Sequence, residues 1–494
     1  MGLGGRTAAA RAFRVLVAGF ATTAAVALLG TVAVTAVPPV MRSVRSPAPT
    51  TSHSPARQTA WTSPMDFDIG VAYDATARDI AQVAVGGTSI ELTLSNLWGN
   101  GTITFGSVTV GIQQSGVNVV PGSILPVTFG RTSRSVTIPA RDSVASDPVA
   151  IVVHAGERLS VSLWEKGPAT VSAHFCCVGR IDSYGTSDGG GDLTSSPTAA
   201  GFNPVLASPD MRWLSAIAVS GSPARGTVVA LGDSITEGFG YQNNGFGWPS
   251  ALESRLARLA PSEQVAVVNE GITGNTLTVF PTGTSYEYTS GGLPGISRLG
   301  PDALSLPGVK DVVLFLGTND IWFGAGGGTG HPIPPYGTAS AIEAGMQAVI
   351  AATHAHGTKI FGVTLLPRAS SNGVNNEKPE AWTPAEQATL SAVDSWMLAP
   401  GSGFDGVINL AAVMGDVYDG TCKPNAPYPP YYTADNLHPN IAGQTVMADA
   451  IPTTLFGIPQ APQLPQRIAA TPTPRCRGAV QAQDALALGR KPAS

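Results

Sequence analysis

The chain has 494 residues, and at about 150 residues per domain this length corresponds to two or three domains. Hydrophobic residues make up 43% and charged residues only 12%, which excludes a charge-rich disordered protein and a long coiled coil. The formal net charge of −5 provides no basic excess that would attract phosphates. We therefore expect no nucleic-acid partner, and uncharged or weakly charged ligands are favoured.

The first 37 residues have the pattern of a targeting segment. Arg6, Arg11 and Arg14 precede a charge-free run from Val15 to Val37. This run is longer than the about 7–15 residues of a secretory h-region and falls within the about 17–25 that span a bilayer. A signal peptide cleaved near Ala36 and a retained signal anchor both remain open. In either case we expect the rest of the chain to be secreted, or anchored to the outer face of the cytoplasmic membrane.

The next two segments differ in composition and in pattern. Residues 38–60 are rich in Pro, Ser and Thr, which predicts an extended linker. Between residues 61 and 220, runs such as Ile90 to Leu94 and Leu159 to Leu163 alternate with period two and are separated by turn residues. This succession of short strands predicts an all-β sandwich domain.

From Thr227 onward, apolar strands alternate with helical stretches. Strands are predicted at 227–231, 265–268, 312–316, 360–364 and 407–410, and helices at 248–259, 339–355, 384–397 and 441–455. Fully apolar strands that alternate with helices indicate a parallel sheet of about five strands with helices on both faces. We therefore predict a flavodoxin-like α/β/α sandwich over residues 226–457, followed by a Pro-rich tail over 458–494.

Four short motifs follow these strands or precede the last helix, at the edge of the sheet where ligands bind in such folds. Ser234 lies in Gly-Asp-Ser directly after the first strand, Gly274 ends the loop after the second, and Asn319 follows the third. Asp435 precedes His438 by three residues, a spacing that allows a carboxylate to orient an imidazole as the base for a nucleophilic serine. Each motif alone is more often a helix cap, a tight turn or a surface loop. Their combination is specific.

Together these residues resemble the SGNH, or GDSL, hydrolase superfamily over about residues 227–456. The resemblance implies Ser234 as nucleophile, with Asp435 and His438 completing a catalytic triad. It implies an oxyanion hole made by the backbone N–H groups of Ser234 and Gly274 and by the side chain of Asn319. The strand-rich front region also looks like that of a secreted actinobacterial subgroup related to acetylxylan esterases. That likeness implies an esterase for short acyl groups on carbohydrates or small esters.

Several alternatives remain beside this interpretation. A lipase or acyl-thioesterase of the same superfamily would use the same residues, and a non-catalytic glycan-binding protein would use the β-sandwich instead. An α/β-hydrolase is disfavoured, because Thr236 occupies the last glycine position of G-x-S-x-G. No cofactor or metal is expected, since His354 and His356 have a spacing that does not place them on one helix face. A membrane is expected as a partner only through an uncleaved anchor.

The cysteines and the front domain lead to two further expectations. Cys176, Cys177, Cys422 and Cys476 are even in number, which suits an oxidising compartment, and a bridge from Cys422 to Cys476 would pin the tail; their pairing stays open. All five candidate site residues follow residue 226, so removal of residues 1–220 is expected to spare the hydrolysis of a small ester. The alternative is that the sandwich packs on the catalytic domain.

Overall fold

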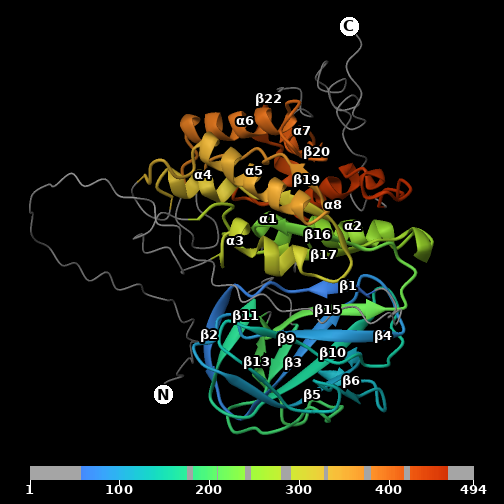
Figure 1. The fold of residues 1–494 in the computed structure, drawn as a ribbon. Coiled ribbons are helices and arrows are strands. Elements are labelled where there is room, and N and C mark those ends of the chain that lie inside the picture. The colour runs from blue at the N-terminus through green and yellow to red at the C-terminus, as the bar shows by residue number, and fades with distance from the viewer. Residues whose placement is uncertain are drawn as a thin grey trace, which may run out of the picture. The chain divides into compact units, whose positions relative to one another are not determined.

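The computed structural model describes residues 57–174, 182–208, 210–239, 246–279, 291–327, 332–371, 380–416 and 423–464 (Figure 1). The predicted targeting segment, most of the predicted linker and all four cysteines lie outside these ranges. Within them, no helix combines the length and the apolar character that a membrane crossing requires.

The front domain is built from antiparallel strands in two principal sheets and a small third one. The first sheet has the order β1 (Arg57–Thr62), β15 (Leu214–Ser220), β4 (Ser89–Ser95) and β9 (Ser143–Ala145). The second has the order β13 (Asn203–Ser208), β12 (Ser183–Gly185), β3 (Ala75–Gln82), β10 (Arg158–Glu165), β5 (Ile103–Ser115) and β6 (Asn118–Val119), with β7 (Leu125–Pro126) and β8 (Val136–Ile138) also paired to β5. The third contains β14 (Met211–Arg212), β11 (Ala169–His174) and β2 (Phe67–Ala72).

One buried cluster joins the two principal sheets. Leu92 of β4 and Ile217 of β15 belong to the same cluster as Val110 of β5 and Val161 of β10. The alternation seen in the sequence is visible in the burial of β4, where inward residues are buried and their neighbours are half-buried. The predicted all-β front domain is therefore confirmed.

The front domain begins earlier than the sequence suggests. Residues 57–60, which composition assigns to the linker, form most of β1, and Gln58, Thr59 and Ala60 are buried. β1 pairs in antiparallel register with β15, a strand more than 150 residues later in the chain. This pairing is a long-range contact, so the local richness in Ser, Thr and Pro did not reveal it.

The second domain contains a five-stranded parallel sheet, as predicted. Its order is β17 (Ala266–Gly271), β16 (Thr227–Gly232), β18 (Val309–Phe315), β19 (Lys359–Val363) and β20 (Gly406–Ile408). In chain order this is the 2-1-3-4-5 arrangement of flavodoxin-like folds. Every residue of β16 is buried, whichever face of the sheet its side chain occupies, which requires cover on both faces.

The helices form two packed groups around this sheet (Figure 1). α2 packs on α8, whereas α5 packs on α3 and α6. The helices are α1 (Ser234–Glu237), α2 (Trp248–Leu256), α3 (Gly295–Leu299), α4 (Thr318–Gly324), α5 (Ala339–Ala355), α6 (Pro384–Leu398), α7 (Ala411–Met414) and α8 (Ile441–Ala450). Shorter elements are η1 (Pro261–Glu263), η2 (Gly300–Leu304), η3 (Pro429–Tyr431), η4 (Thr453–Phe456) and the pair β21 (Gly415–Asp416) and β22 (Lys423–Pro427).

Two boundaries at the end of the domain differ from the sequence-based prediction. The helix predicted over 441–455 ends at Ala450 and is followed by a short η4, because Pro452 disfavours a helical conformation at the residue before it. Residues 458–464, assigned to the tail, pack on the second domain. Ile458 and Ala461 are buried there, and the fully buried Arg255 of α2 donates a hydrogen bond to the Ala461 carbonyl at 3.0 Å.

The two domains are in contact where β1 packs against β17, and these strands lie side by side in Figure 1. The contacts are both polar and apolar. The Thr227 hydroxyl donates to the Thr59 carbonyl at 2.8 Å, and the Thr62 hydroxyl donates to the Asn269 carbonyl at 3.2 Å. Ala266 of β17 is fully buried and belongs to the cluster of the front domain. These contacts favour the alternative in which the sandwich packs on the catalytic domain.

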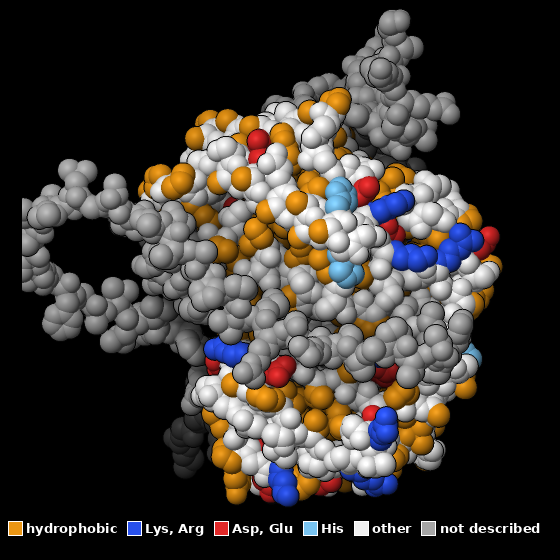
Figure 2. Space-filling model, viewed as in Figure 1, with side chains coloured by type: hydrophobic (Ala, Val, Ile, Leu, Met, Phe, Trp, Pro, Cys, Tyr) orange, Lys and Arg blue, Asp and Glu red, His pale blue; other side chains and the backbone are white. Residues whose placement is uncertain are grey.

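Charged side chains are sparse on the surface. On the face shown in Figure 2, most of the surface of the described residues is orange and white, and blue and red side chains occupy a small part of it. This distribution agrees with a chain in which 12% of residues are charged.

A fragment that begins at residue 221 is therefore expected to be insoluble, or less stable and less active than a fragment of residues 57–494. Loss of the front domain uncovers β17 around Ala266. It also leaves the Thr227 hydroxyl and the Asn269 carbonyl without their hydrogen-bond partners in β1. Thermal unfolding and turnover of p-nitrophenyl acetate by both fragments check this. Equal melting temperatures and equal kcat would show that the boundary contributes nothing to the catalytic domain.

Candidate active site

Ser234 lies at a sharp turn between β16 and the single-turn helix α1. Asp233 caps this helix, because its side chain accepts a hydrogen bond from the Ile235 N–H at 3.0 Å. Gly238 ends the helix with φ of +94°, a left-handed conformation that glycine adopts without strain. Buried Gln444 of α8 fixes the turn from the other side, since its side-chain amide donates to the Ile235 carbonyl at 3.1 Å.

The structure brings Ser234, His438 and Asp435 into one hydrogen-bonded row. His438 Nε2 lies 2.9 Å from Ser234 Oγ, and His438 Nδ1 lies 2.7 Å from Asp435 Oδ2. Both distances are within the range expected for a nucleophile and base, and for a base and its orienting carboxylate. The ring of Phe239 packs against the imidazole, with ring centroids 4.8 Å apart.

Asp435 is held by several donors in addition to His438. Its Oδ1 accepts hydrogen bonds from the Thr433 hydroxyl at 2.7 Å and from the backbone N–H groups of Leu437 and His438 at 2.9 Å each. Burial by itself would raise the pKa of Asp435, but the hydrogen bonds that it accepts and its electrostatic interaction with His438 lower this pKa well below its usual value. Asp435 is therefore ionised at neutral pH.

Gly274 lies on the loop after β17, Asn319 lies on the segment after β18, and a hydrogen bond to Asn275 links the two. Gly274 has φ of +76°, and the side-chain N–H₂ of Asn319 donates to the Asn275 carbonyl at 2.9 Å. Asn319 belongs to the first turn of α4, not to a loop as the sequence suggests, and Gly317, with φ of +134°, precedes this helix. The structure thus places both residues beside the end of β16, and their role as oxyanion donors stays a prediction.

Asp320, the next residue of α4, also links this helix to the segment that follows Gly274. Its carboxylate accepts hydrogen bonds from the backbone N–H groups of Leu277 at 2.8 Å and Thr278 at 2.9 Å. Burial raises the pKa of Asp320, and these hydrogen bonds oppose the shift. Because Asn319 is the neighbour of Asp320 in α4, these hydrogen bonds also fix the position of Asn319 relative to the Gly274 loop.

Two further buried carboxyl groups flank α1. Burial raises the pKa of Asp233 to about 7, against the opposing hydrogen bond from Ile235. Burial also raises the pKa of Glu237 to about 7, although Glu237 Oε2 accepts a hydrogen bond from the Thr273 hydroxyl. Thr273 directly precedes Gly274, so Glu237 connects the Ser234 turn to that loop.

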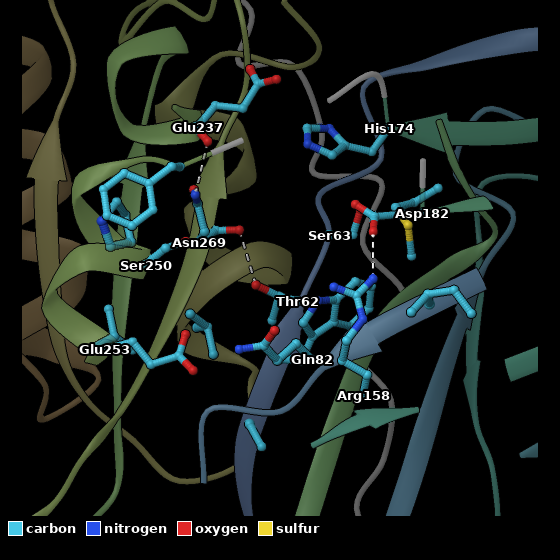
Figure 3. Close-up of a pocket in the computed structure, with 18 of the residues that line it drawn as sticks. Thr62, Ser63, Gln82, Arg158, His174, Asp182, Glu237, Ser250, Glu253 and Asn269 are labelled. Carbon is cyan, nitrogen blue, oxygen red and sulfur yellow. Dashed lines mark hydrogen bonds and ion pairs between the residues drawn. The ribbon is translucent and has the colours of Figure 1, made fainter. Parts of the chain in front are cut away.

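A cavity of about 480 Å³ lies at the boundary of the two domains (Figure 3). Among its lining residues are Trp61, Arg158 and His174 from the front domain and Glu237, Glu253 and Asn269 from the catalytic domain. Ser234 and His438 do not belong to its described lining. The cavity is therefore separate from the triad, although Glu237 reaches it from the helix that Ser234 begins.

Several residues of this region were not singled out from the sequence. Asn275 and Asp320 directly follow the motif residues Gly274 and Asn319, so adjacency was their only signal. Arg298 of α3 lies outside every predicted element, and its guanidinium contacts residues distant in sequence and Asp302 of the following η2. The two histidines His354 and His356 each have a hydrogen-bond partner of their own. His354 Nε2 lies 3.0 Å from Asp405 Oδ2, and His356 Nδ1 lies 3.0 Å from Thr358 Oγ1.

Residues 230–446 match the model of the GDSL-like lipase/acylhydrolase family. Among solved structures, the acetyl xylan esterase AlAXEase is 23% identical with a TM-score of 0.31, and the match covers 45% of this chain and 96% of that one. Axe2, an acetylxylan esterase from Geobacillus stearothermophilus, is 19% identical with a TM-score of 0.33, covering 48% and 97%. LAE5, an alpha/beta hydrolase enzyme from the metagenome of Lake Arreo in Spain, is 22% identical with a TM-score of 0.32, covering 47% and 94%. No curated protein sequence matches the chain.

The range that matches the family begins within β16 and ends within α8. It therefore includes the Ser234 turn, the Gly274 loop, the start of α4 with Asn319 and the segment from Asp435 to His438. Residues 230–446 belong to the GDSL-like lipase/acylhydrolase family, and the chain is a serine hydrolase that acts on ester bonds.

Proposed function

We propose that Ser234, His438 and Asp435 form the catalytic triad of a two-step esterase. The observation that carries this proposal is the position of His438, whose two ring nitrogens lie at hydrogen-bond distance from Ser234 Oγ and Asp435 Oδ2. An ionised Asp435 favours the tautomer of His438 with a proton on Nδ1, so that Nε2 is free to accept the serine proton. The enzyme assignment sets aside the alternative of a non-catalytic glycan-binding protein.

In the first step, His438 Nε2 removes the proton of Ser234 Oγ, which forms a bond to the ester carbonyl carbon. The tetrahedral intermediate collapses when the bond to the leaving alcohol breaks, and the imidazolium of His438 protonates that alcohol. In the second step, His438 accepts a proton from water, the resulting hydroxide attacks the acyl-enzyme, and Ser234 recovers its proton as the carboxylic acid product leaves. Asp435 stays ionised throughout and stabilises the imidazolium.

The negative charge of the tetrahedral oxygen would be stabilised by the backbone N–H groups of Ser234 and Gly274 and by the Asn319 side chain. Support comes from the contacts that hold these groups in place before substrate binds, namely the Asn319 to Asn275 hydrogen bond and the Asp320 to Leu277 hydrogen bond. Donors that are already oriented require no reorganisation as the charge develops.

We further propose that the substrates are short acyl esters of carbohydrates or of small alcohols, hydrolysed outside the cytoplasm. The low charge of the chain and the resemblance of the front region to that of acetylxylan-esterase-related proteins support this substrate class, and the charge-free run from Val15 to Val37 supports the location. A lipase or acyl-thioesterase would use the same triad and differ in acyl chain length or in the leaving group.

Replacement Ser234→Ala is expected to lower kcat to below about one per cent of the wild-type value, because the nucleophilic oxygen is lost. The fold should be retained, since only one oxygen atom is removed from a residue that is 6% exposed. Hydrolysis of p-nitrophenyl acetate and thermal unfolding measure both effects. A variant that retains more than about one per cent of kcat would overturn the assignment of the nucleophile.

Replacement Asn319→Ala is expected to lower kcat by about 10²–10³ with little change in KM, the signature of a donor that acts mainly in the transition state. Steady-state kinetics on the same ester give both parameters. If KM rises while kcat stays constant, Asn319 binds the ground-state substrate and is not an oxyanion donor.

The substrate class is tested with p-nitrophenyl esters of increasing chain length, a thioester and acetylated xylan. We expect kcat/KM to be highest for acetate and to fall as the acyl chain lengthens, with release of acetate from xylan. A maximum at long acyl chains would favour the lipase alternative, and preference for the thioester would favour an acyl-thioesterase.

A further inference from the structure

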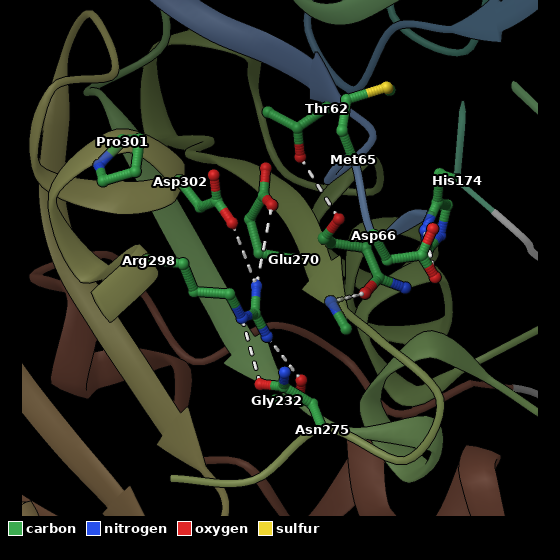
Figure 4. Close-up of polar contacts among 12 residues, drawn as sticks. Thr62, Met65, Asp66, His174, Gly232, Glu270, Asn275, Arg298, Pro301 and Asp302 are labelled. Atoms are coloured by element: carbon green, nitrogen blue, oxygen red, sulfur yellow. Dashed lines mark hydrogen bonds and ion pairs between the residues drawn. The ribbon is translucent and has the colours of Figure 1, made fainter. Parts of the chain in front are cut away.

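We propose that Arg298 is a positioning residue that holds the Ser234 turn, the Gly274 loop and the start of α4 in register. This inference rests on the roles proposed above for Ser234, Gly274 and Asn319. Arg298 belongs to α3, its side chain is 2% exposed, and it lies beside Gly232 at the carboxyl end of β16 (Figure 4).

The guanidinium donates to both segments that would carry backbone oxyanion donors. Arg298 Nη2 donates to the Gly232 carbonyl at 2.7 Å, and Arg298 Nε donates to Asn275 Oδ1 at 3.0 Å (Figure 4). Gly232 is two residues before Ser234, and Asn275 directly follows Gly274. One planar group thus fixes the distance between the two backbone donors.

The third donor is reached through Asn275. The carbonyl of Asn275 accepts the hydrogen bond from the Asn319 side chain at 2.9 Å, and its side-chain N–H₂ donates to the carbonyls of Gly291 and, at 2.8 Å, Leu293. A displacement of Asn275 would therefore move Gly274 and Asn319 together.

Two carboxyl groups complete the surroundings of the guanidinium. Arg298 Nη1 donates to Asp302 Oδ2 at 3.3 Å and lies 4.0 Å from Glu270 Oε2. Burial raises the pKa of both Glu270 and Asp302, and the positive charge of Arg298 opposes both shifts. A buried ionic cluster of this kind is weak support for stability, because apolar replacements are often neutral. The contacts of Arg298 with Gly232 and Asn275 instead indicate that Arg298 positions these two residues.

Lysine cannot replace arginine at this position without loss of these contacts. The guanidinium offers five N–H donors in a fixed plane, whereas an ammonium group is a single flexible point of charge. Arg298→Lys therefore keeps the charge beside Glu270 and Asp302 but cannot donate to Gly232 and Asn275 with the same geometry.

The test compares Arg298→Lys with the wild-type full-length chain on p-nitrophenyl acetate. We expect kcat to fall by about 10- to 100-fold while KM changes less than about twofold, because misplacement of the donors by about 1 Å affects mainly the transition state. The affinity of an alkylboronic acid, which forms a tetrahedral adduct with an active serine, should fall by a similar factor. A purely structural role would change the melting temperature and leave kcat and boronate affinity of the folded enzyme unchanged, and that result would overturn the inference.

Arg78 provides a matched control, since it is another fully buried arginine whose guanidinium donates to backbone carbonyls. It lies in β3 of the front domain and donates to the carbonyls of Val117 at 2.8 Å and Ser196 at 2.7 Å. Arg78→Lys should lower the melting temperature without lowering kcat of the folded enzyme. An equal loss of kcat in both variants would assign the effect to general destabilisation and reject a specific role for Arg298.

If Arg298→Lys does not fold, Asn275→Ala decides the question. This variant removes the acceptor of Arg298 Nε, together with the donor to the Gly291 and Leu293 carbonyls, but keeps the backbone carbonyl that accepts from Asn319. A fall in kcat with unchanged KM would support the inference, and an unchanged kcat would overturn it. The two proposals are tested separately. If Ser234→Ala remains active, the proposed function is wrong. If Ser234→Ala is inactive and Arg298→Lys is fully active, only the role of Arg298 is rejected.

Discussion

The parallel register of three neighbouring strands, β17, β16 and β18, is the constraint on which the active site depends. Gly232 at the end of β16 pairs with Gly271 of β17 on one side and with Phe315 of β18 on the other. The three segments that follow these strands therefore leave the sheet at one edge and at one height. This register, together with the loop that precedes α8, brings Ser234, Gly274 and Asn319 together with His438, although more than 200 residues separate the first from the last.

At this edge of the sheet, the pKa of Asp435 is lowered, whereas the pKa values of Asp233 and Glu237 are raised. Asp435 receives hydrogen bonds from two backbone N–H groups, a hydroxyl and an imidazole, which outweigh the effect of its burial on the pKa. Asp233 and Glu237 receive fewer such bonds, and burial raises the pKa of each to about 7. The hydrogen bonds to Asp435 and its electrostatic interaction with His438 therefore make Asp435 the permanent anion beside this imidazole.

The boundary with the front domain lies close to these same loops. Thr62 of β1 contacts the Asn269 carbonyl in β17, the strand that leads into the Gly274 loop, and Asn269 in turn donates to the Thr236 carbonyl of α1 at 3.0 Å. A short path of hydrogen bonds thus leads from the front domain to the helix that Ser234 begins. The catalytic domain has its own buried core, but one edge strand of its sheet, β17, also contributes Ala266 to the core of the neighbouring domain.

The sequence by itself determined the fold class of both domains and the residues of the candidate triad, because these depend on local patterns. Helix α5 spans the predicted range, and Ile342, Met346 and Val349 form its buried face, since period and burial coincide in an amphipathic helix. Only the tertiary structure decided the pairing of β1 with β15 and the packing of residues 458–464, which join segments distant in the chain. The same holds for Arg298, because a buried arginine has no local signature: its position is set by Gly232 and Asn275, which lie on separate strands and loops and meet it only when the sheet has formed.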